Sequence, residues 1–223
     1  PHNPSGKVFT RAELETIAGL CRRYDTLAIT DEIYEHIIYD GARHVSIATL
    51  PGMADRTVTI SGLSKTYSIT GWRLAYAIAC ERITSAIRKV HDFLTVGAPH
   101  PLQEAGAVAL RLPESFYAEL AAMYERKRGM LHHALTEAGL RCSQPAGAYY
   151  IMADIAHLGF ADDFATADFM LDEVGVAAVP GSSFYSRAEL GRSKVRFTFS
   201  KSNETIAMAA QRLRQLPQKV AAR

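Results

Sequence analysis

Two side chains that could do chemistry, a carboxylate and an amine, each follow a stretch of sequence that is typical of a buried strand. Asp31 comes directly after the largely apolar run Leu-Ala-Ile-Thr at residues 27–30, and Lys65 lies shortly beyond the strand-like run Thr-Val-Thr-Ile at residues 57–60. In open α/β sheets, ligands bind at the edge formed by the carboxyl ends of the strands. An amine can act there as a nucleophile, and a carboxylate can pair with a cation or move a proton. These positions favour a ligand site, although spacing alone does not define its chemistry.

The elements that would position these residues alternate between helix and strand. Residues 10–13, Thr-Arg-Ala-Glu, form a capping box, and apolar residues then recur at helical spacing as far as residue 24. Further along the chain, a third strand is expected at residues 74–79, and helices are expected at residues 82–93 and 102–110. This order predicts an α/β layer with a mainly parallel sheet.

The pattern changes in the second half of the chain. A long helix is expected from residue 113 to residue 138, and shorter elements of mixed type follow it. These elements are expected strands at residues 147–153, 176–179 and 195–199, and expected helices at residues 164–173 and 204–216. Such a mixture is typical of a separate α+β unit.

The composition is that of an ordinary globular protein and argues against two classes of partner. Of the 223 residues, 48% are hydrophobic, and 25 basic against 23 acidic residues give a formal net charge of +2. This balance argues against a nucleic-acid-binding surface, and no apolar run reaches the roughly 20 residues that a membrane-spanning helix needs. The widely spaced Cys21, Cys80 and Cys142 include no CxxC pair. Free thiols of this kind indicate a reducing compartment, so a cytoplasmic location is expected.

The motif around Lys65 points to a known family. Residues 62–75 read Gly-Leu-Ser-Lys-Thr-Tyr-Ser-Ile-Thr-Gly-Trp-Arg-Leu-Ala. This string resembles the cofactor-attachment signature of class I/II pyridoxal-phosphate-dependent aminotransferases, which have fold type I. Three further motifs resemble segments of the same family, in family order: Asn-Pro-Ser-Gly at residues 3–6, Asp-Glu-Ile-Tyr at residues 31–34, and Val-Arg-Phe at residues 195–197. Four motifs along nearly the whole chain make the resemblance specific.

The resemblance implies a fold and a division of the chain. The expected fold is the C-terminal portion of a large, mainly parallel α/β/α domain, followed by a smaller α+β C-terminal domain. Residues 1–112 would be the remainder of the large cofactor-binding domain, residues 113–140 a long interdomain helix, and residues 141–223 the small domain. The upstream half of the large domain is missing from this segment.

The resemblance also assigns the catalytic role to Lys65 and cofactor-binding roles to three further residues. Lys65 is implied to form a Schiff base with pyridoxal 5'-phosphate and then, once released by the substrate, to move a proton as general base and acid. Asp31 is implied to pair with the pyridine nitrogen of the cofactor and to keep it protonated. Tyr34 and Asn3 are implied to hydrogen-bond the 3-oxygen of the ring.

The remaining site residues are implied to bind anions. Arg73 is implied to hold the cofactor phosphate, because a planar guanidinium suits bidentate contact with an anion. Ser64 and Ser61 could add hydroxyl donors to the same phosphate, although many relatives have the phosphate-binding serine at the position of Gly62. Arg196 is implied to bind the α-carboxylate of the substrate. No metal-ligand pattern accompanies these residues.

The function implied is transfer of an amino group from an L-amino acid to a 2-oxo acid, in ping-pong half-reactions. Family members are nearly twice as long and usually homodimeric, so we expect a homodimer and an incomplete fragment that binds the cofactor weakly. Two alternatives share these residues: a C–S lyase or cyclopropane-forming synthase on the same fold, and the effector domain of a transcription regulator that senses pyridoxal phosphate. Tyr149 and Tyr150 resemble a segment near the family's active site, but core packing is expected of both.

Overall fold

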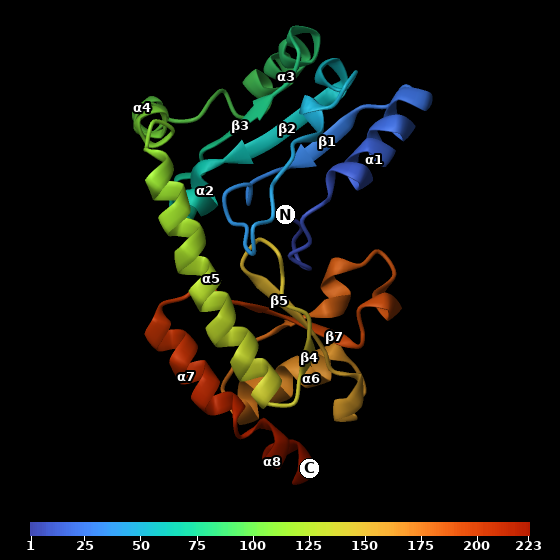
Figure 1. The fold of residues 1–223 in the computed structure, drawn as a ribbon, viewed down its shortest axis with the longest axis vertical. Coiled ribbons are helices and arrows are strands. Elements are labelled where there is room, and N and C mark those ends of the chain that lie inside the picture. Colours follow the sequence, from blue (N-terminus) through green and yellow to red (C-terminus); the bar gives the residue numbers. More distant parts are fainter. The chain divides into compact units, whose positions relative to one another are not determined.

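In the computed structural model, which describes residues 1–223, the chain folds into two compact units (Figure 1). The first unit comprises Pro1 and Val8–Leu120, and the second comprises His2–Lys7 and Ala121–Arg223. The long helix α5 (Glu114–Glu137) therefore begins in the first unit and ends in the second. The domain limits drawn from the family resemblance stay a prediction. No helix combines the length and the apolar composition that crossing a membrane would require.

The first unit starts with helix α1 (Arg11–Arg23), whose beginning is set by the capping box. The Thr10 side chain accepts a hydrogen bond from the backbone amide of Glu13, and the Glu13 carboxylate accepts one from the backbone amide of Thr10 at 2.8 Å. These bonds satisfy amides that a helix N-terminus otherwise leaves unpaired. The helix predicted from this motif is confirmed.

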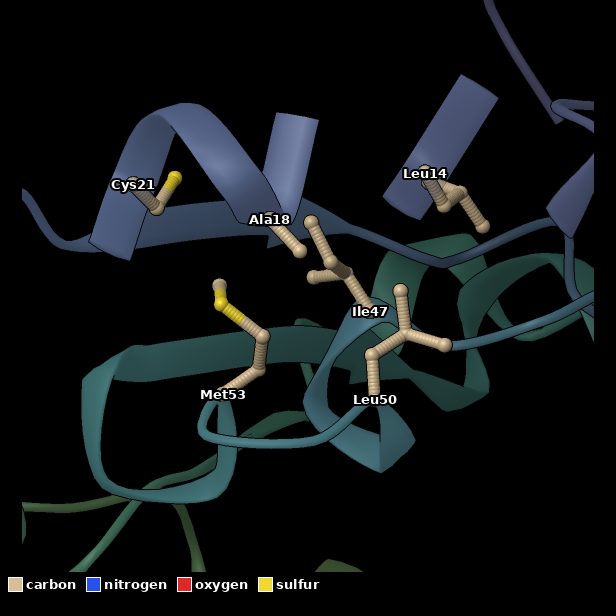
Figure 2. Packing of buried hydrophobic residues seen from close by; sticks show 6 residues of the cluster. All are labelled: Leu14, Ala18, Cys21, Ile47, Leu50 and Met53. Carbon is tan, nitrogen blue, oxygen red and sulfur yellow. The ribbon is translucent and has the colours of Figure 1, made fainter. Parts of the chain in front are cut away.

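One face of α1 packs on the segment before the second strand and forms the core of the first unit. Figure 2 shows this cluster of buried apolar side chains, which includes Ile47 of the 3-10 helix Ile47–Thr49. Its members are Leu14, Ala18, Cys21, Ile47, Leu50 and Met53. The members from α1 follow one another at helical spacing and so share one face of that helix. Burying each large side chain stabilises the unit by about 1.5–3 kcal/mol.

The sheet of the first unit has three strands in the order β1-β2-β3. They are β1 (Ala28–Asp31), β2 (Thr57–Gly62) and β3 (Ala75–Ile78). β1 and β2 run parallel, as expected, whereas β2 and β3 run antiparallel. The reason is the connection between them, which holds the one-turn helix α2 (Leu63–Thr66) and no helix long enough to serve as a crossover.

Two helices, α3 (Glu81–Leu94) and α4 (His100–Ala109), complete the first unit before α5 and confirm the predicted helices. Several large apolar side chains of this unit are exposed, among them Ile29 of β1 at 70% and Phe93 of α3 at 94%. The strand β1 also has a neighbour on one side only. Open strand edges and apolar surfaces of this kind are typical of regions that contact other protein.

The second unit contains an antiparallel four-stranded sheet in the order β4-β5-β7-β6. The strands are β4 (Arg141–Cys142), β5 (Tyr150–Asp154), β6 (Val179–Pro180) and β7 (Lys194–Thr198). In β7, Arg196 lies opposite Met152 of β5 on one side and opposite Val179 of β6 on the other. Pairing on both sides gives Arg196 a firmly held backbone.

Helices cover this sheet and supply much of its core. They are the second part of α5 together with α6 (Asp163–Phe169), α7 (Asn203–Leu213) and α8 (Leu216–Ala221). A π-helical turn, Met170–Val174, continues α6. The side chains of Leu135 in α5, Ile151 in β5 and Leu213 in α7 are all 0% exposed, so each of these elements buries apolar side chains.

The structure departs from two predicted elements of the second unit. The strand predicted at residues 176–179 is reduced to Val179–Pro180. Gly175 has a left-handed backbone with φ of 74°, and Pro180 has no amide to extend the ladder. The helix predicted at residues 204–216 is divided into α7 and α8, and a proline stands in the first turn of α8, where it is tolerated.

Candidate active site

The carboxyl ends of β1 and β2 meet at one edge of the sheet in the first unit. The parallel register pairs Asp31, the last residue of β1, with Ile60 of β2. β2 ends at Gly62, and Lys65 follows directly in α2. Asp31 and Lys65 therefore lie at the same edge, which is where a sheet of this type binds its ligands.

Asp31 begins a tight turn that also carries Tyr34. The Asp31 carboxylate accepts a hydrogen bond from the backbone amide of Ile33 at 3.1 Å, which is an Asx turn. The backbone amide of Glu32 donates to the carbonyl of Ile60 at 2.8 Å and so ties the turn to β2. Asp31 is exposed, while Tyr34 is only 5% exposed. The Asp31 carboxylate is thus held in place and remains accessible to a ligand.

Glu32, next to Asp31, is buried and braces the turn through three hydrogen bonds. Its carboxylate accepts hydrogen bonds from Thr30 Oγ1 at 2.9 Å and Ser46 Oγ at 2.8 Å, and it lies 2.7 Å from His44 Nε2. Burial raises the pKa of Glu32, but the hydrogen bonds from His44, Ser46 and Thr30 outweigh burial and lower the pKa below its ordinary value. Glu32 is therefore an ionised structural group.

Ser61, near the end of β2, uses its hydroxyl within the protein. Ser61 Oγ donates to Glu35 Oε1 at 2.8 Å, and the Tyr76 hydroxyl donates to the same oxygen at 3.4 Å. Contact with a phosphate would require the same proton as a donor. Glu35 also forms, with Glu32 and His44, a group whose ligand atoms lie within 4.8 Å of one another. Because both carboxylates already accept hydrogen bonds from serine hydroxyls, we assign no metal ion to this group.

Helix α2 carries the Lys65 amine, and the loop that follows α2 carries the hydroxyl of Thr70 and the guanidinium of Arg73. Thr70 Oγ1 donates to the carbonyl of Ser64 at 3.0 Å, and Arg73 Nη1 donates to the carbonyl of Thr70 at 3.0 Å. Arg73 has a left-handed backbone, with φ of 55° and ψ of 40°, and its side chain is exposed. The loop therefore holds the backbone of Arg73 in place while its guanidinium stays open to an anion.

Gly62 immediately precedes α2 and leaves no space for a side chain. A Cβ on Gly62 would lie 2.9 Å from the Cα and Cβ of Ala75 and 3.0 Å from the carbonyl oxygen of Leu74. Gly62 and Ala75 face each other in the β2–β3 ladder, so this approach is set by backbone pairing. A serine at this position is sterically excluded here, which leaves Ser64 and Arg73 as the better candidates for phosphate contact.

An aromatic cluster that the sequence analysis did not identify supports the short helix of Lys65. The hydroxyl groups of Tyr67 and Tyr117 are 2.8 Å apart, and the Tyr67 ring stacks on Phe116 with 5.6 Å between ring centres. The ring of His36 lies 4.3 Å from that of Tyr117. Burial, followed by the hydrogen bond with Tyr117, raises the pKa of Tyr67 well above its ordinary value. Since a single helical turn is unstable alone, these contacts hold α2 in place.

In the second unit, the Asn-Pro-Ser-Gly motif forms a turn from Asn3 to Gly6. The backbone amide of Gly6 donates to the carbonyl of His2 at 2.7 Å, and Gly147 donates to the carbonyl of Gly6 at 2.9 Å. Gly6 has φ of 69°. A Cβ there would overlap Pro145 and would lie 2.7 Å from the carbonyl oxygen of Gly147, so only glycine fits. The turn fixes the position of Asn3.

Asn3 and Arg196 come from opposite ends of the chain and meet in the second unit. Arg196 Nη1 donates to Asn3 Oδ1 at 2.7 Å. The guanidinium carbon lies 4.1 Å from the ring centre of Tyr150 and 4.5 Å from that of Phe184. Arg196 Nε is buried and has no hydrogen-bond partner. A guanidinium that is held in this way and keeps unused donors is suited to bind a carboxylate.

The two tyrosines before Ile151 have different environments. Tyr149 packs in the core against Tyr124, with 5.6 Å between ring centres, as expected. Tyr150 is also buried, but its ring lies on Arg196. Neighbouring side chains point to opposite faces of a strand, so the alternation could have indicated that one tyrosine lies on the face of Arg196. No local signal marks Phe184, because its position depends on the pairing of β6 with β7.

The predicted site residues are distributed over both units. The first unit contains Asp31, Tyr34, Ser61, Ser64, Lys65 and Arg73, and the second contains Asn3 and Arg196. In the first unit, Asp31 and Lys65 share one edge of the sheet. In the second unit, Asn3 and Arg196 are in direct contact.

Known proteins resemble this chain along nearly its whole length. The family described as "Aminotransferase class I and II" matches residues 1–213. Kynurenine–oxoglutarate transaminase of Dictyostelium discoideum is 37% identical over a region that covers 97% of this chain and 55% of that protein. The chain thus spans about half the length of the curated relatives it matches.

Solved structures share the fold. The structure of N-succinyldiaminopimelate aminotransferase from Mycobacterium tuberculosis has a TM-score of 0.93 and 36% identity, and covers 97% of this chain and 56% of that chain. The aromatic aminotransferase from Pyrococcus horikoshii has a TM-score of 0.90 and 38% identity, and covers 99% of this chain and 59% of that chain. The expected fold type I is confirmed. With the family match over residues 1–213, this chain belongs to the class I and II aminotransferases.

Proposed function

We propose that this chain is part of a pyridoxal-phosphate-dependent aminotransferase, which moves an amino group from an L-amino acid to a 2-oxo acid. The observation that carries the proposal is the 2.7 Å contact between Arg196 and Asn3. The contact joins residues from two separate motifs and leaves a guanidinium with a buried, unpartnered Nε. Family membership supports the reaction class, and Arg196 supports the binding of the α-carboxylate that every amino-acid substrate carries.

The side chains of the first unit fit pyridoxal 5'-phosphate by the chemistry of their donors. Lys65 supplies an amine for the carbonyl carbon, Asp31 a carboxylate for the ring nitrogen, and Arg73 a guanidinium for the phosphate. Asp31 and Lys65 share one sheet edge, and Arg73 lies in the loop that follows Lys65. The chemistry that the cofactor supplies, when bound, is that of an electron sink for negative charge at the substrate α-carbon.

Each of these residues has a distinct task in the proposed reaction. Lys65 would hold the cofactor through its amine, and the free amine would move a proton at the substrate α-carbon. Asp31 would keep the ring nitrogen protonated, and its Asx turn holds the carboxylate in one orientation. Tyr34 would donate to the ring 3-oxygen, an assignment that rests on the family motif. Asn3 keeps its amide nitrogen as a donor because its Oδ1 is used by Arg196, and the assignment of this donor to the 3-oxygen rests on the family motif.

We assign the contacts with the cofactor phosphate to Arg73 and Ser64 in preference to Ser61. Arg73 is exposed and uses one nitrogen on the carbonyl of Thr70. Ser64 lies beside Lys65 in α2, and its backbone carbonyl accepts a hydrogen bond from Thr70 Oγ1. Ser61 would have to give up its 2.8 Å hydrogen bond to Glu35 to donate to a phosphate. Ser61 therefore ranks last among the three.

Two properties of the whole protein belong to this proposal. A homodimer is supported by the family resemblance and by apolar side chains such as Phe93, which is 94% exposed. A cytoplasmic location is supported by the three free cysteines, Cys21, Cys80 and Cys142. Sedimentation of the protein at several concentrations tests the first property, and a chain that stays monomeric throughout would contradict it for this segment.

Borohydride trapping tests the proposed role of Lys65. The chain is incubated with pyridoxal 5'-phosphate, reduced, digested and analysed for modified lysine peptides by mass spectrometry. Lys65 is expected to carry several-fold more label than Lys89, which is an exposed lysine of α3. Occupancy below one label per chain is expected, because the chain spans about half the length of its relatives.

Two variants sharpen this test. Lys65→Ala is expected to abolish the selective label, whereas the matched control Lys89→Ala is expected to leave it unchanged. Label spread evenly over the exposed lysines, with no preference for Lys65, would contradict the proposal. Stoichiometric labelling of this chain alone would instead contradict the expectation that it is an incomplete site.

A further inference from the structure

We infer that Phe184 and Tyr150 make Arg196 selective for planar carboxylates over tetrahedral anions such as sulfonates and phosphonates. The inference rests on the proposed function, because it concerns the arginine proposed to bind the α-carboxylate. It adds two specificity-determining side chains to that site, and neither belongs to the motifs that identified Arg196.

The two rings reach the guanidinium of Arg196 from the two sides of β7. Tyr150 belongs to β5, and Phe184 ends the 3-10 helix Gly181–Phe184 that follows β6. In the sheet, β7 lies between β5 and β6. The guanidinium carbon is 4.1 Å from one ring centre and 4.5 Å from the other, and both lie within the roughly 6 Å at which a cation is attracted to a ring face. The two rings therefore flank the guanidinium, and a ligand would meet the guanidinium edge between them.

A ligand that binds at this edge must be flat to avoid the rings. A guanidinium and a carboxylate can lie in one plane and share two parallel N–H···O bonds. The three oxygens of a sulfonate or phosphonate cannot all lie in that plane, so at least one oxygen points toward a ring. Ring faces carry partial negative charge, and a negatively charged oxygen against them is unfavourable. The rings of Tyr150 and Phe184 should therefore disfavour tetrahedral anions and leave carboxylates unaffected.

Both rings are held firmly enough to act in this way. Tyr150 is 8% exposed and contacts the ring of Tyr149, with 4.8 Å between ring centres. The helix that carries Phe184 is anchored by the backbone amide of Ser182, which donates to the Asp163 carboxylate at 2.7 Å. Asp163 is only 1% exposed, so this anchor is protected from water. A ring that cannot swing aside can reject an anion of the wrong shape.

The test uses the whole chain with ¹⁵N-labelled arginine and follows the Nε–H signal of Arg196 by NMR. Acetate and methanesulfonate are titrated separately, since both are monoanions with one methyl group and differ in the shape of the head group. Acetate is expected to bind more tightly, and Phe184→Leu is expected to narrow the ratio of the two dissociation constants by about threefold. The matched control is Phe164→Leu, which removes a 55% exposed ring of α6 and should leave the ratio unchanged.

Further variants separate the possible outcomes. Arg196→Met identifies the signal by its disappearance from the spectrum. If acetate shifts the Arg196 signal but Phe184→Leu leaves the ratio of the two dissociation constants as in the wild type, the inference is overturned and the proposed carboxylate site stands. If acetate does not shift the Arg196 signal of the wild type, the proposed role of Arg196 fails together with the inference. Phe184→Met, whose unbranched side chain is longer and adapts its shape more easily, serves as the second variant should Phe184→Leu unfold, and it is expected to narrow the ratio in the same direction.

Discussion

Replacing Glu32 with alanine is expected to destabilise the first unit by about 3–5 kcal/mol. The Glu32 side chain is 6% exposed and lies 2.7 Å from His44 Nε2, and it also accepts hydrogen bonds from Ser46 and Thr30 at 2.8 and 2.9 Å. A hydrogen bond to a charged group contributes about 1.5–3 kcal/mol. The sum of three such bonds is an upper limit for the stability lost in Glu32→Ala, because the His44 side chain is 20% exposed and can bond to water once the Glu32 carboxylate is removed.

The same network predicts how this contribution depends on pH. Burial raises the pKa of Glu32, but the hydrogen bonds from His44, Ser46 and Thr30 outweigh it, so the pKa in the folded protein lies below the ordinary value. The unfolded chain then binds the proton more readily than the folded one. The stabilisation is therefore complete above the unfolded-state pKa and is lost as the pH falls through the folded-state pKa. The stability difference between wild type and Glu32→Ala should shrink below about pH 4.

Urea unfolding followed by the fluorescence of Trp72 measures this effect. Trp72 is the only tryptophan and belongs to the first unit. The midpoint of Glu32→Ala is expected to fall by about 2 M, for a typical dependence on urea. Glu15→Ala is the matched control: Glu15 is 54% exposed and pairs with Arg11 in the same unit, and its loss should change stability by less than about 1 kcal/mol. Equal midpoints for the two variants would refute the reasoning about the buried network.

Two further predictions concern how the site residues are held. Gly6→Ala should destabilise the second unit by more than about 1 kcal/mol, because the residue has φ of 69° and its Cβ would overlap Pro145. Calorimetry tests this against Gly129→Ala in α5, which meets nothing within 4 Å and should stabilise the helix by about 0.5–1 kcal/mol. A double-mutant cycle of Tyr67→Phe and Tyr117→Phe should give a coupling of about 1 kcal/mol for their 2.8 Å hydrogen bond; no coupling would mean that this pair does not brace the Lys65 helix.

Part of the sheet in the first unit is exposed and could bind other protein. Ile29 is 70% exposed although it lies in a strand, and β1 has an open edge. Surface of this kind favours association with other protein. Measurements of stability and labelling on this chain should therefore be compared at several protein concentrations, because association would raise its apparent stability.

Local patterns in the sequence were sufficient to predict most of the elements and to name most of the candidate residues. The capping box at Thr10 and Glu13 predicts α1 because both hydrogen bonds form within a single helical turn. Short runs of β-branched and apolar residues predict β1 and β2 with small errors at their ends. The expected burial is confirmed for β2 and wrong for β1, whose Ile29 is 70% exposed. Lys65, Asp31 and Arg196 were named from motifs, which are also local in sequence.

Only the tertiary structure decided which of these side chains are free to act and what surrounds them. Ser61 is in a position that suits phosphate binding, yet its proton goes to Glu35, which lies on another segment of the chain. The approach of Ala75 to Gly62, and of Phe184 to Arg196, depends on strand pairing between distant segments. The physical reason is the range of the interactions: capping and periodicity act within a few residues, whereas hydrogen-bond partners and ring contacts are set by packing across the fold. The sequence thus determined the chemical groups of the candidate site, and the fold decided their partners.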